Sequence, residues 1–132
     1  MEQTIILGDV NITYLLKAAS KFKEILQLPK NEITRDAAIQ RFEFTYELVW
    51  KTLKRILSVK GITVNNPRDV FREGGKQNLI SNVEAWFKII EYRNKTTNVY
   101  NEDMADEIYA ALSGINDMIQ KFIVTCISLE KS

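Results

Sequence analysis

Histidine is missing from this sequence, and cysteine, proline and glycine are scarce. The 132 residues include no histidine, one cysteine (Cys126), two prolines and five glycines. Without histidine, the chain lacks the commonest general base near neutral pH and the commonest metal ligand. A single cysteine excludes an internal disulfide and a cysteine-rich zinc site, and it fits a reducing compartment. We therefore expect a cytoplasmic protein that holds no metal and no cofactor.

Long apolar runs and a strong charge of either sign are also missing. No stretch approaches the ~20 apolar residues that span a bilayer, and the start of the chain has no basic, apolar signal-peptide pattern. The formal net charge is +1, so no bulk attraction to nucleic acid or anionic lipid is expected. The composition predicts a soluble protein without a membrane partner, in which any contact with RNA or a nucleotide needs a local patch.

What is present is a helical pattern over one domain, residues 1–132. Few prolines and glycines and no alternating apolar pattern argue against a sheet. The 3.6-residue spacing of apolar residues predicts an all-α fold of four long helices and one short one. The expected elements run from about Asp9 or Asn11 to Leu28, from Thr34 to Lys60, from Asn66 to Gly74-Gly75, from Ser81 to about Lys95, and from Asn101 or Asp103 to nearly Glu130.

Local signals fix these expected ends. Thr34 is a plausible N-cap, and Gly61 ends the second helix. Asn66 followed by proline opens the short helix, because asparagine caps well and proline suits the first helical position. Ser81 and Glu84 match a capping box at the start of the fourth helix. The apolar seam of the last helix consists of Met104, Ile108, Leu112, Ile115, Ile119, Phe122 and Cys126.

The second helix has three distinct stripes. The core stripe is Phe42, Tyr46, Val49, Leu53 and Ile56. A narrower apolar stripe roughly opposite is Ala37, Phe44 and Leu48, which predicts a subunit contact or, alternatively, scattered surface hydrophobes. A polar stripe lies between them and comprises Gln40, Glu43, Glu47, Lys51 and Lys54. Glu47 and Lys51 also fit an ordinary i,i+4 surface pair.

Arg93 is the sharpest signal in the fourth helix. It follows Val83, Trp86, Ile89 and Ile90 on the inward side of that helix. Because arginine is costly to bury without a partner, Arg93 should pair with a carboxylate or project into a cleft. The alternative is a basic residue that counters the helix dipole before a turn. A polar connector rich in hydrogen-bonding side chains, residues 94–101, follows it.

These residues resemble a known family. Residues 35–51, with the sequence RDAAIQRFEFTYELVWK, are similar to the signature helix of nucleotidyltransferase substrate-binding proteins, which belong to the HEPN superfamily. Residues 66–73 and 86–101 are similar to later segments of that family. The resemblance implies an up-and-down four-helix bundle, a homodimer, and a separate minimal nucleotidyltransferase as partner. It places Ala37, Phe44 and Leu48 at or beside the dimer contact.

The resemblance also implies a site around Arg93. In HEPN ribonucleases of toxin–antitoxin pairs, an arginine and a histidine cleave RNA without metal, and a nearby tyrosine receives a nucleotidyl group. The corresponding residues here are Arg93, Asn98 and Tyr100. Neutral asparagine cannot carry a proton near pH 7, which would cost such a reaction about 10²–10⁴-fold.

Two functions remain open. The first is a non-catalytic subunit that presents Arg93, Asn94, Asn98 and Tyr100 to a substrate, nucleotide or partner, with no catalytic residue of its own. Its supporting polar stripe would be Gln40, Glu43, Glu47 and Lys51, and Tyr100 would be the residue modified. The second is a HEPN-type ribonuclease toxin with a degraded motif, in which Glu43 and Glu47 are the nearest substitutes for the histidine.

Overall fold

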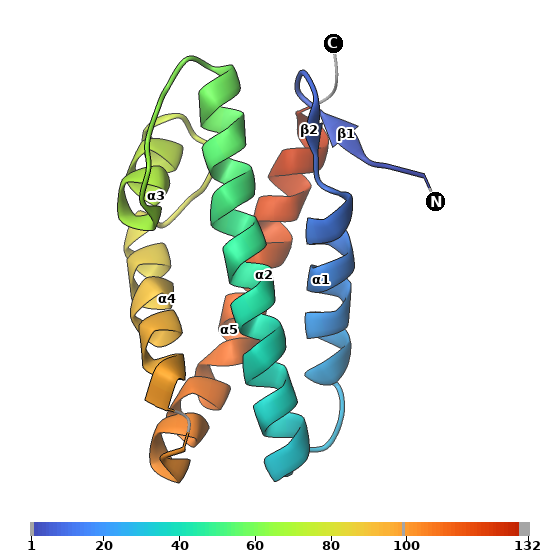
Figure 1. Cartoon of the computed structure of the whole chain (residues 1–132), viewed down its shortest axis with the longest axis vertical. Coiled ribbons are helices and arrows are strands. Elements are labelled where there is room, and N and C mark those ends of the chain that lie inside the picture. The colour runs from blue at the N-terminus through green and yellow to red at the C-terminus, as the bar shows by residue number, and fades with distance from the viewer. Residues whose placement is uncertain (1, 99, 130–132) are drawn as a thin grey trace.

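The computed structural model describes residues 2–98 and 100–129, most of which are helical. Four long helices run up and down the molecule and a short fifth helix packs beside them, which confirms the predicted fold class (Figure 1). The expected end of the last helix near Glu130 lies outside the described residues. In chain order the elements are β1 (Ile5–Ile6), β2 (Val10–Asn11), α1 (Thr13–Ile25), α2 (Glu32–Val59), α3 (Pro67–Lys76), α4 (Val83–Lys95), the 3-10 turn η1 (Thr96–Asn98) and α5 (Glu102–Ser128).

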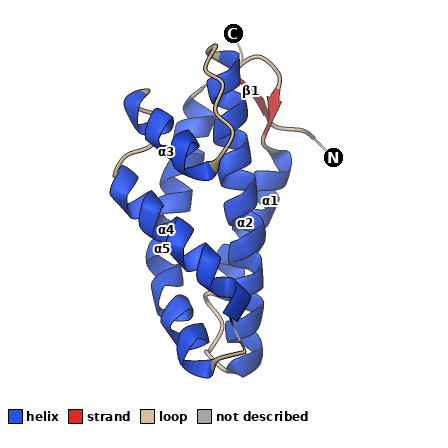
Figure 2. Ribbon diagram, turned by 60° about the vertical axis from the view of Figure 1, so that its left-hand side comes forward, coloured by secondary structure: helices blue, strands red, loops and turns tan. Residues whose placement is uncertain are grey.

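Helix α2 is the central element of the bundle. It packs against α1, α3 and α5. In Figure 1, α1 lies on one side of α2, α3 and α4 lie on the other, and α5 passes behind. Figure 2 shows the same bundle turned by 60°, with the link between α3 and α4 part-way along its length. None of the helices in the described part of the chain combines the length and apolar character that crossing a membrane requires.

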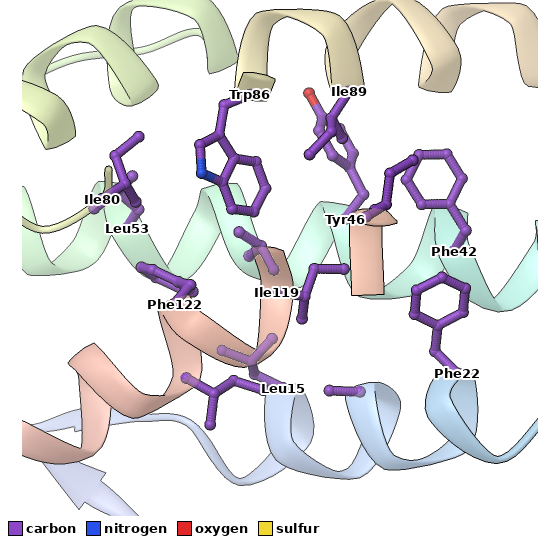
Figure 3. Packing of buried hydrophobic residues seen from close by; sticks show 14 of the residues in the cluster. Leu15, Phe22, Phe42, Tyr46, Leu53, Ile80, Trp86, Ile89, Ile119 and Phe122 are labelled. Atoms are coloured by element: carbon purple, nitrogen blue, oxygen red, sulfur yellow. The ribbon is translucent and has the colours of Figure 1, made fainter. Parts of the chain in front are cut away.

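The core confirms the predicted inward faces. All five residues of the core stripe on α2 are buried, and so is the α5 seam except Met104, which is half-buried. A row of aromatic rings crosses the core, formed by Phe22, Phe42, Tyr46, Phe71 and Trp86. Figure 3 labels Phe22, Phe42, Tyr46 and Trp86 among the buried side chains. Each large apolar side chain buried in this way contributes about 1.5–3 kcal/mol. This packing holds α2, α4 and α5 in fixed positions.

The N-terminal hairpin corrects two expectations. The strands β1 and β2 pair antiparallel, with Gly8 at φ +69° in the turn between them, so a small sheet does exist. Helix α1 consequently begins at Thr13 and not at Asp9 or Asn11, and it ends at Ile25, before Leu28. The Leu7 amide donates to the Leu129 carbonyl at 3.0 Å, which joins the hairpin to the end of α5.

The start of α2 lies earlier than predicted. Asn31 is the N-cap: its side chain accepts from the Thr34 amide, and the Thr34 hydroxyl accepts from the Asn31 amide, both at 2.9 Å. Thr34 therefore belongs to the capping box but lies three residues inside the helix. The predicted starts of α3 and α5 are confirmed, since Asn66 and Asn101 cap those helices.

The junction of α3 and α4 differs from the prediction. Helix α3 continues through Gly74 and Gly75 to Lys76. The predicted capping box of Ser81 and Glu84 is wrong, because Asn82 is the N-cap of α4. Asn82 has a left-handed backbone at φ 55°, a conformation that asparagine tolerates better than most residues.

Candidate functional site

The contact between α2 and α4 brings Arg93 to the polar stripe of α2. Arg93 lies on the last turn of α4, and 27% of its side chain is exposed. Its Nη1 lies 3.9 Å from Glu43 Oε2, and its Nε lies 3.8 Å from Glu47 Oε1. The structure thus places Arg93 beside two carboxylates, which is the pairing expected for an arginine on an inward-facing side of a helix.

The guanidinium group of Arg93 is only partly satisfied by hydrogen bonds. Its Nη1 donates to Thr96 Oγ1 at 3.1 Å, and the Thr96 hydroxyl donates back to the Arg93 carbonyl at 2.6 Å. The distances to the two carboxylates exceed the 2.7–3.2 Å of an N–H···O hydrogen bond. Arg93 Nε is buried and has no hydrogen-bond partner among the described residues. A buried donor without an acceptor normally costs about 1–3 kcal/mol, so the hydrogen bonding of the Arg93 guanidinium is incomplete in this structure.

Glu47 is held more firmly than Glu43. Its Oε2 accepts from Trp50 Nε1 at 3.0 Å, while Lys51 Nζ lies 3.9 Å from the same oxygen. The surface pair with Lys51 therefore exists, but Glu47 also faces Arg93 and Trp50. Sequence reasoning missed Trp50, although a tryptophan three residues after a glutamate on a helix is within reach of its carboxylate.

Tyr46 lies buried on the same section of α2. Burial raises the pKa of its hydroxyl above the ordinary value, the Glu47 charge raises this pKa further, and the Arg93 charge lowers it in part. The hydroxyl therefore remains protonated at neutral pH. Tyr46 therefore does not serve as a base.

The other predicted site residues at and after the end of α4 lie outside this cluster. Asn94, Asn98 and Tyr100 are exposed, with 84% of Tyr100 accessible. The Tyr100 hydroxyl donates to Asn98 Oδ1 at 3.4 Å, a long hydrogen bond. Gln40 is also exposed, and no hydrogen bond or ion pair in the described residues joins it to Arg93. The structure groups Arg93 with the two glutamates and Thr96, and it leaves Asn94, Asn98 and Tyr100 facing solvent.

The second apolar stripe of α2 is less uniform than predicted. Ala37 and Leu48 are half-buried and pack against the core, while 60% of Phe44 is exposed. Phe44 and Leu48 line a groove of about 420 Å³ between α1 and α2. The other residues that line this groove are Tyr14, Lys17, Ala18, Lys21, Arg41 and Glu47. Within residues 2–98 and 100–129, no group of three histidine, cysteine or acidic side chains is placed to hold a metal ion.

Comparison with known proteins identifies the family. Residues 10–126 match the family described as "Nucleotidyltransferase substrate binding protein like". The chain belongs to this family. Its fold is similar to that of a Thermus thermophilus protein in a crystal structure, with a TM-score of 0.79, 29% identity, and coverage of 83% of this chain and 96% of the other.

Haemophilus influenzae provides two further matches, one a solved structure and one a curated sequence. One solved structure is described as the fold of a substrate binding domain of a nucleotidyltransferase, with a TM-score of 0.77, 23% identity, and coverage of 89% of this chain and 99% of the other. The second, a curated protein of strain Rd, is named "Probable ribonuclease HepT" and is 34% identical over 80 residues. That alignment covers 57% of this chain and 55% of the relative, so the chain spans about half the length of the curated relative it matches.

Proposed function

We propose that this nucleotidyltransferase substrate-binding protein is the non-catalytic, substrate- or nucleotide-binding subunit of a two-component system. In this proposal, it acts as a homodimer with a separate nucleotidyltransferase chain. Membership of the family supports the nucleotidyltransferase partner. The observation that carries the binding role is Arg93, whose Nε is buried and has no hydrogen-bond partner in the described part of the chain. A guanidinium with unused donors suits a phosphate or carboxylate, because its planar fork matches their oxygens.

Tyr100 is the acceptor in this proposal if the partner modifies the subunit. Its side chain is 84% exposed and its hydroxyl makes only one long hydrogen bond, so a second protein can reach it. Tyr100 follows Arg93 by seven residues along the chain. The connector between them is joined to the Arg93 side chain by the hydrogen bond from Arg93 to Thr96. The exposed Asn94 and Asn98 flank this surface as further hydrogen-bonding groups.

The alternative is a HEPN-type ribonuclease of a toxin–antitoxin pair, which the name of the curated relative favours. Cleavage of RNA without metal requires a group that removes a proton from the 2′-hydroxyl and one that protonates the leaving oxygen. The 132 residues contain no histidine, and Tyr46 is held protonated by its surroundings. The arrangement at Arg93 therefore supports binding of a phosphate group more strongly than its turnover.

A ribonuclease assay on the purified protein separates the two functions. We expect the wild type to cleave single-stranded RNA in EDTA no faster than buffer does. Asn98→His should introduce measurable cleavage, because it supplies the proton carrier typically worth about 10²–10⁴-fold. Arg93→Ala in that background should abolish the gain, since the phosphate would lose its charge partner.

Asn94→His is a matched control, because it places the same imidazole on the same exposed surface at a different register. It should leave the RNA intact. Robust cleavage by the wild type, unaffected by Arg93→Ala, would contradict the proposed binding role and favour the ribonuclease.

A further inference from the structure

Arg93 has more negative charge beside it than its own positive charge can balance. Glu43 and Glu47 both approach the guanidinium, at 3.9 and 3.8 Å. The cation that offsets them is Lys51, which lies 3.9 Å from the Glu47 oxygen that Arg93 does not approach. An anion that approaches Arg93 must therefore also approach two carboxylates.

The two carboxylates neutralise Arg93 without using its donors. At 3.8–3.9 Å neither makes a hydrogen bond to the guanidinium, and the buried Nε has no acceptor among the described residues. Glu47 does make a hydrogen bond elsewhere, because the Trp50 indole donates to its second oxygen at 3.0 Å. Trp50 thus fixes Glu47 where its charge lowers the positive potential at Arg93, although neither carboxylate accepts a hydrogen bond from the guanidinium.

We infer that Glu47, with Glu43 beside it, is an internal counter-ion that competes with anionic ligands at Arg93 and selects against highly charged ones. This inference rests on the proposed binding role of Arg93. It specifies the ligand: a group with one negative charge, such as a phosphodiester, is preferred over a terminal phosphate with two. Glu47 is a specificity-determining residue, and Trp50 is a positioning residue that acts through it.

The selectivity follows from the charge of the ligand. Repulsion between a fixed carboxylate and a bound anion is proportional to the charge on the anion. A phosphate monoester has a second pKa of ~6 and is a dianion at pH 8, whereas a diester carries one charge. Removal of the Glu47 charge should therefore multiply the affinity for a dianion by the square of the factor for a monoanion.

Dimethyl phosphate and methyl phosphate provide the test, because they differ in charge and little in shape. Each is titrated at pH 8 into the full-length protein, and the Arg93 Nε–H signal is followed by ¹⁵N NMR. Glu47→Gln removes the charge but keeps an oxygen for the Trp50 hydrogen bond. We expect it to tighten dimethyl phosphate binding by at least about fourfold and methyl phosphate binding by at least about 16-fold, which Coulomb's law gives across ~5 Å with the dielectric constant of bulk water. Glu43→Gln should act in the same direction and gives a second test if Glu47→Gln does not fold.

The matched control is Glu91→Gln, which makes the same change in net charge on α4. Glu91 is exposed and pairs with Lys88 at 3.3 Å, so this variant should change both affinities by less than about twofold. Adding Arg93→Ala to Glu47→Gln should abolish the gain. Equal gains for the two anions, or no gain, would overturn the counter-ion role. If wild-type binding depends on Arg93 in that case, the proposed function stands. Binding that is absent, or insensitive to Arg93→Ala, would overturn the proposed function as well.

Discussion

Two arginines, the buried Arg35 and the partly exposed Arg93, differ in how their side chains are paired. Arg35 is 4% exposed, and it donates to Asp36, Glu102 and Asp106 at 2.9, 2.7 and 3.2 Å. All three distances are those of real hydrogen bonds, so Arg35 closes the contact between the starts of α2 and α5. Arg93 faces its carboxylates at 3.8–3.9 Å with an unused donor. Arg35, Asp36, Glu102 and Asp106 thus form a structural cluster of ion pairs, called the clasp below. Arg93 is the arginine that we propose binds a ligand.

Asp106 in this clasp gives a stability that depends on pH. Hydrogen bonding to Lys30 and then to Arg35 lowers the pKa of the Asp106 carboxyl below its ordinary value. A group whose folded-state pKa is depressed stabilises the fold above its unfolded-state pKa of ~3.9, and this contribution is lost as the pH falls through the folded-state value. We expect Asp106→Asn to lower the melting temperature at pH 7, and the difference from wild type to shrink steadily below about pH 4. Thermal unfolding followed by circular dichroism between pH 7 and 3 measures it.

Asp103→Asn is the control for this effect. Asp103 is exposed on the first turn of α5, before Asp106, and takes part in no ion pair of the described residues. It lies in the favourable helix-dipole position but outside the clasp, so its substitution should have a smaller effect at pH 7. A loss in Asp106→Asn that is equal at every pH would mean that packing and not charge is responsible.

Sequence reasoning reached one of these arginines and not the other. Arg93 was identifiable because it is a charged residue on the apolar face of its own helix, and such a position requires a special role. Arg35 lies within the signature segment, but two of its partners are 67 and 71 residues away. No local spacing connects groups so far apart, because only the packing of α5 on α2 brings them together.

At the scale of elements, α3 shows a helix whose glycines serve packing. Gly74 faces the side chains of Leu53 and Ile80, and Gly75 faces Val83 so closely that a Cβ would overlap it. The sequence alone suggested that two consecutive glycines end a helix, since glycine is a poor helix former. Here the absence of a side chain lets α3 approach α2 and the start of α4, and tertiary contact outweighs helix propensity.

Substitution of alanine for glycine should therefore have opposite effects on α3 and α5. A Cβ at Gly74 would lie 2.8 Å from Leu53 Cδ2, so Gly74→Ala should destabilise the protein by about 1–3 kcal/mol through overpacking. Gly114 lies within α5 and has no atom within 4 Å of the added Cβ. Gly114→Ala should stabilise by about 0.5–1 kcal/mol, because alanine loses less backbone entropy in a helix. Chemical denaturation measures both, and a stabilising Gly74→Ala would contradict the packing role.

The element boundaries were predictable where the chemistry is local. Asn66-Pro67 and Asn101 were identified as helix starts because capping depends on side chains within three residues. The hairpin was missed because each strand has two residues, too few to show an alternating pattern. Asn82 was missed because its left-handed backbone depends on the conformation of the segment that links α3 to α4.

At the scale of the whole molecule, one feature of the surface is left without a covering element. Phe44 is 60% exposed on the groove between α1 and α2, next to Tyr14, which is 66% exposed. The predicted stripe of Ala37, Phe44 and Leu48 is only partly on this surface, because the first and last also pack inward. The sequence could indicate an extra apolar side of α2, but the division of that side between core and surface depends on where α1 lies.

The proposed homodimer makes Phe44 the residue whose substitution is most informative. In an isolated protomer the Phe44 side chain faces solvent, so the fold should tolerate the charge that Phe44→Glu introduces. A second copy packed there would have to bury that charge without a partner, which is strongly unfavourable. We expect the association to weaken by at least about 100-fold, which corresponds to about 2.7 kcal/mol. Light scattering should then report the 15.3 kDa of a single chain in place of twice that mass.

Ile33→Glu distinguishes a specific contact from a general effect of surface hydrophobicity. Ile33 lies on the first turn of α2 and is 81% exposed, more than Phe44, but it lies outside the groove. A dimer built on the groove should keep its mass in this variant, because the new charge stays in water. If Ile33→Glu dissociates the dimer and Phe44→Glu does not, the subunit contact lies at the N-terminal start of α2 and not along the groove. Because Glu47 lines the same groove and faces Arg93, a contact through Phe44 would also place the second copy beside the anion site.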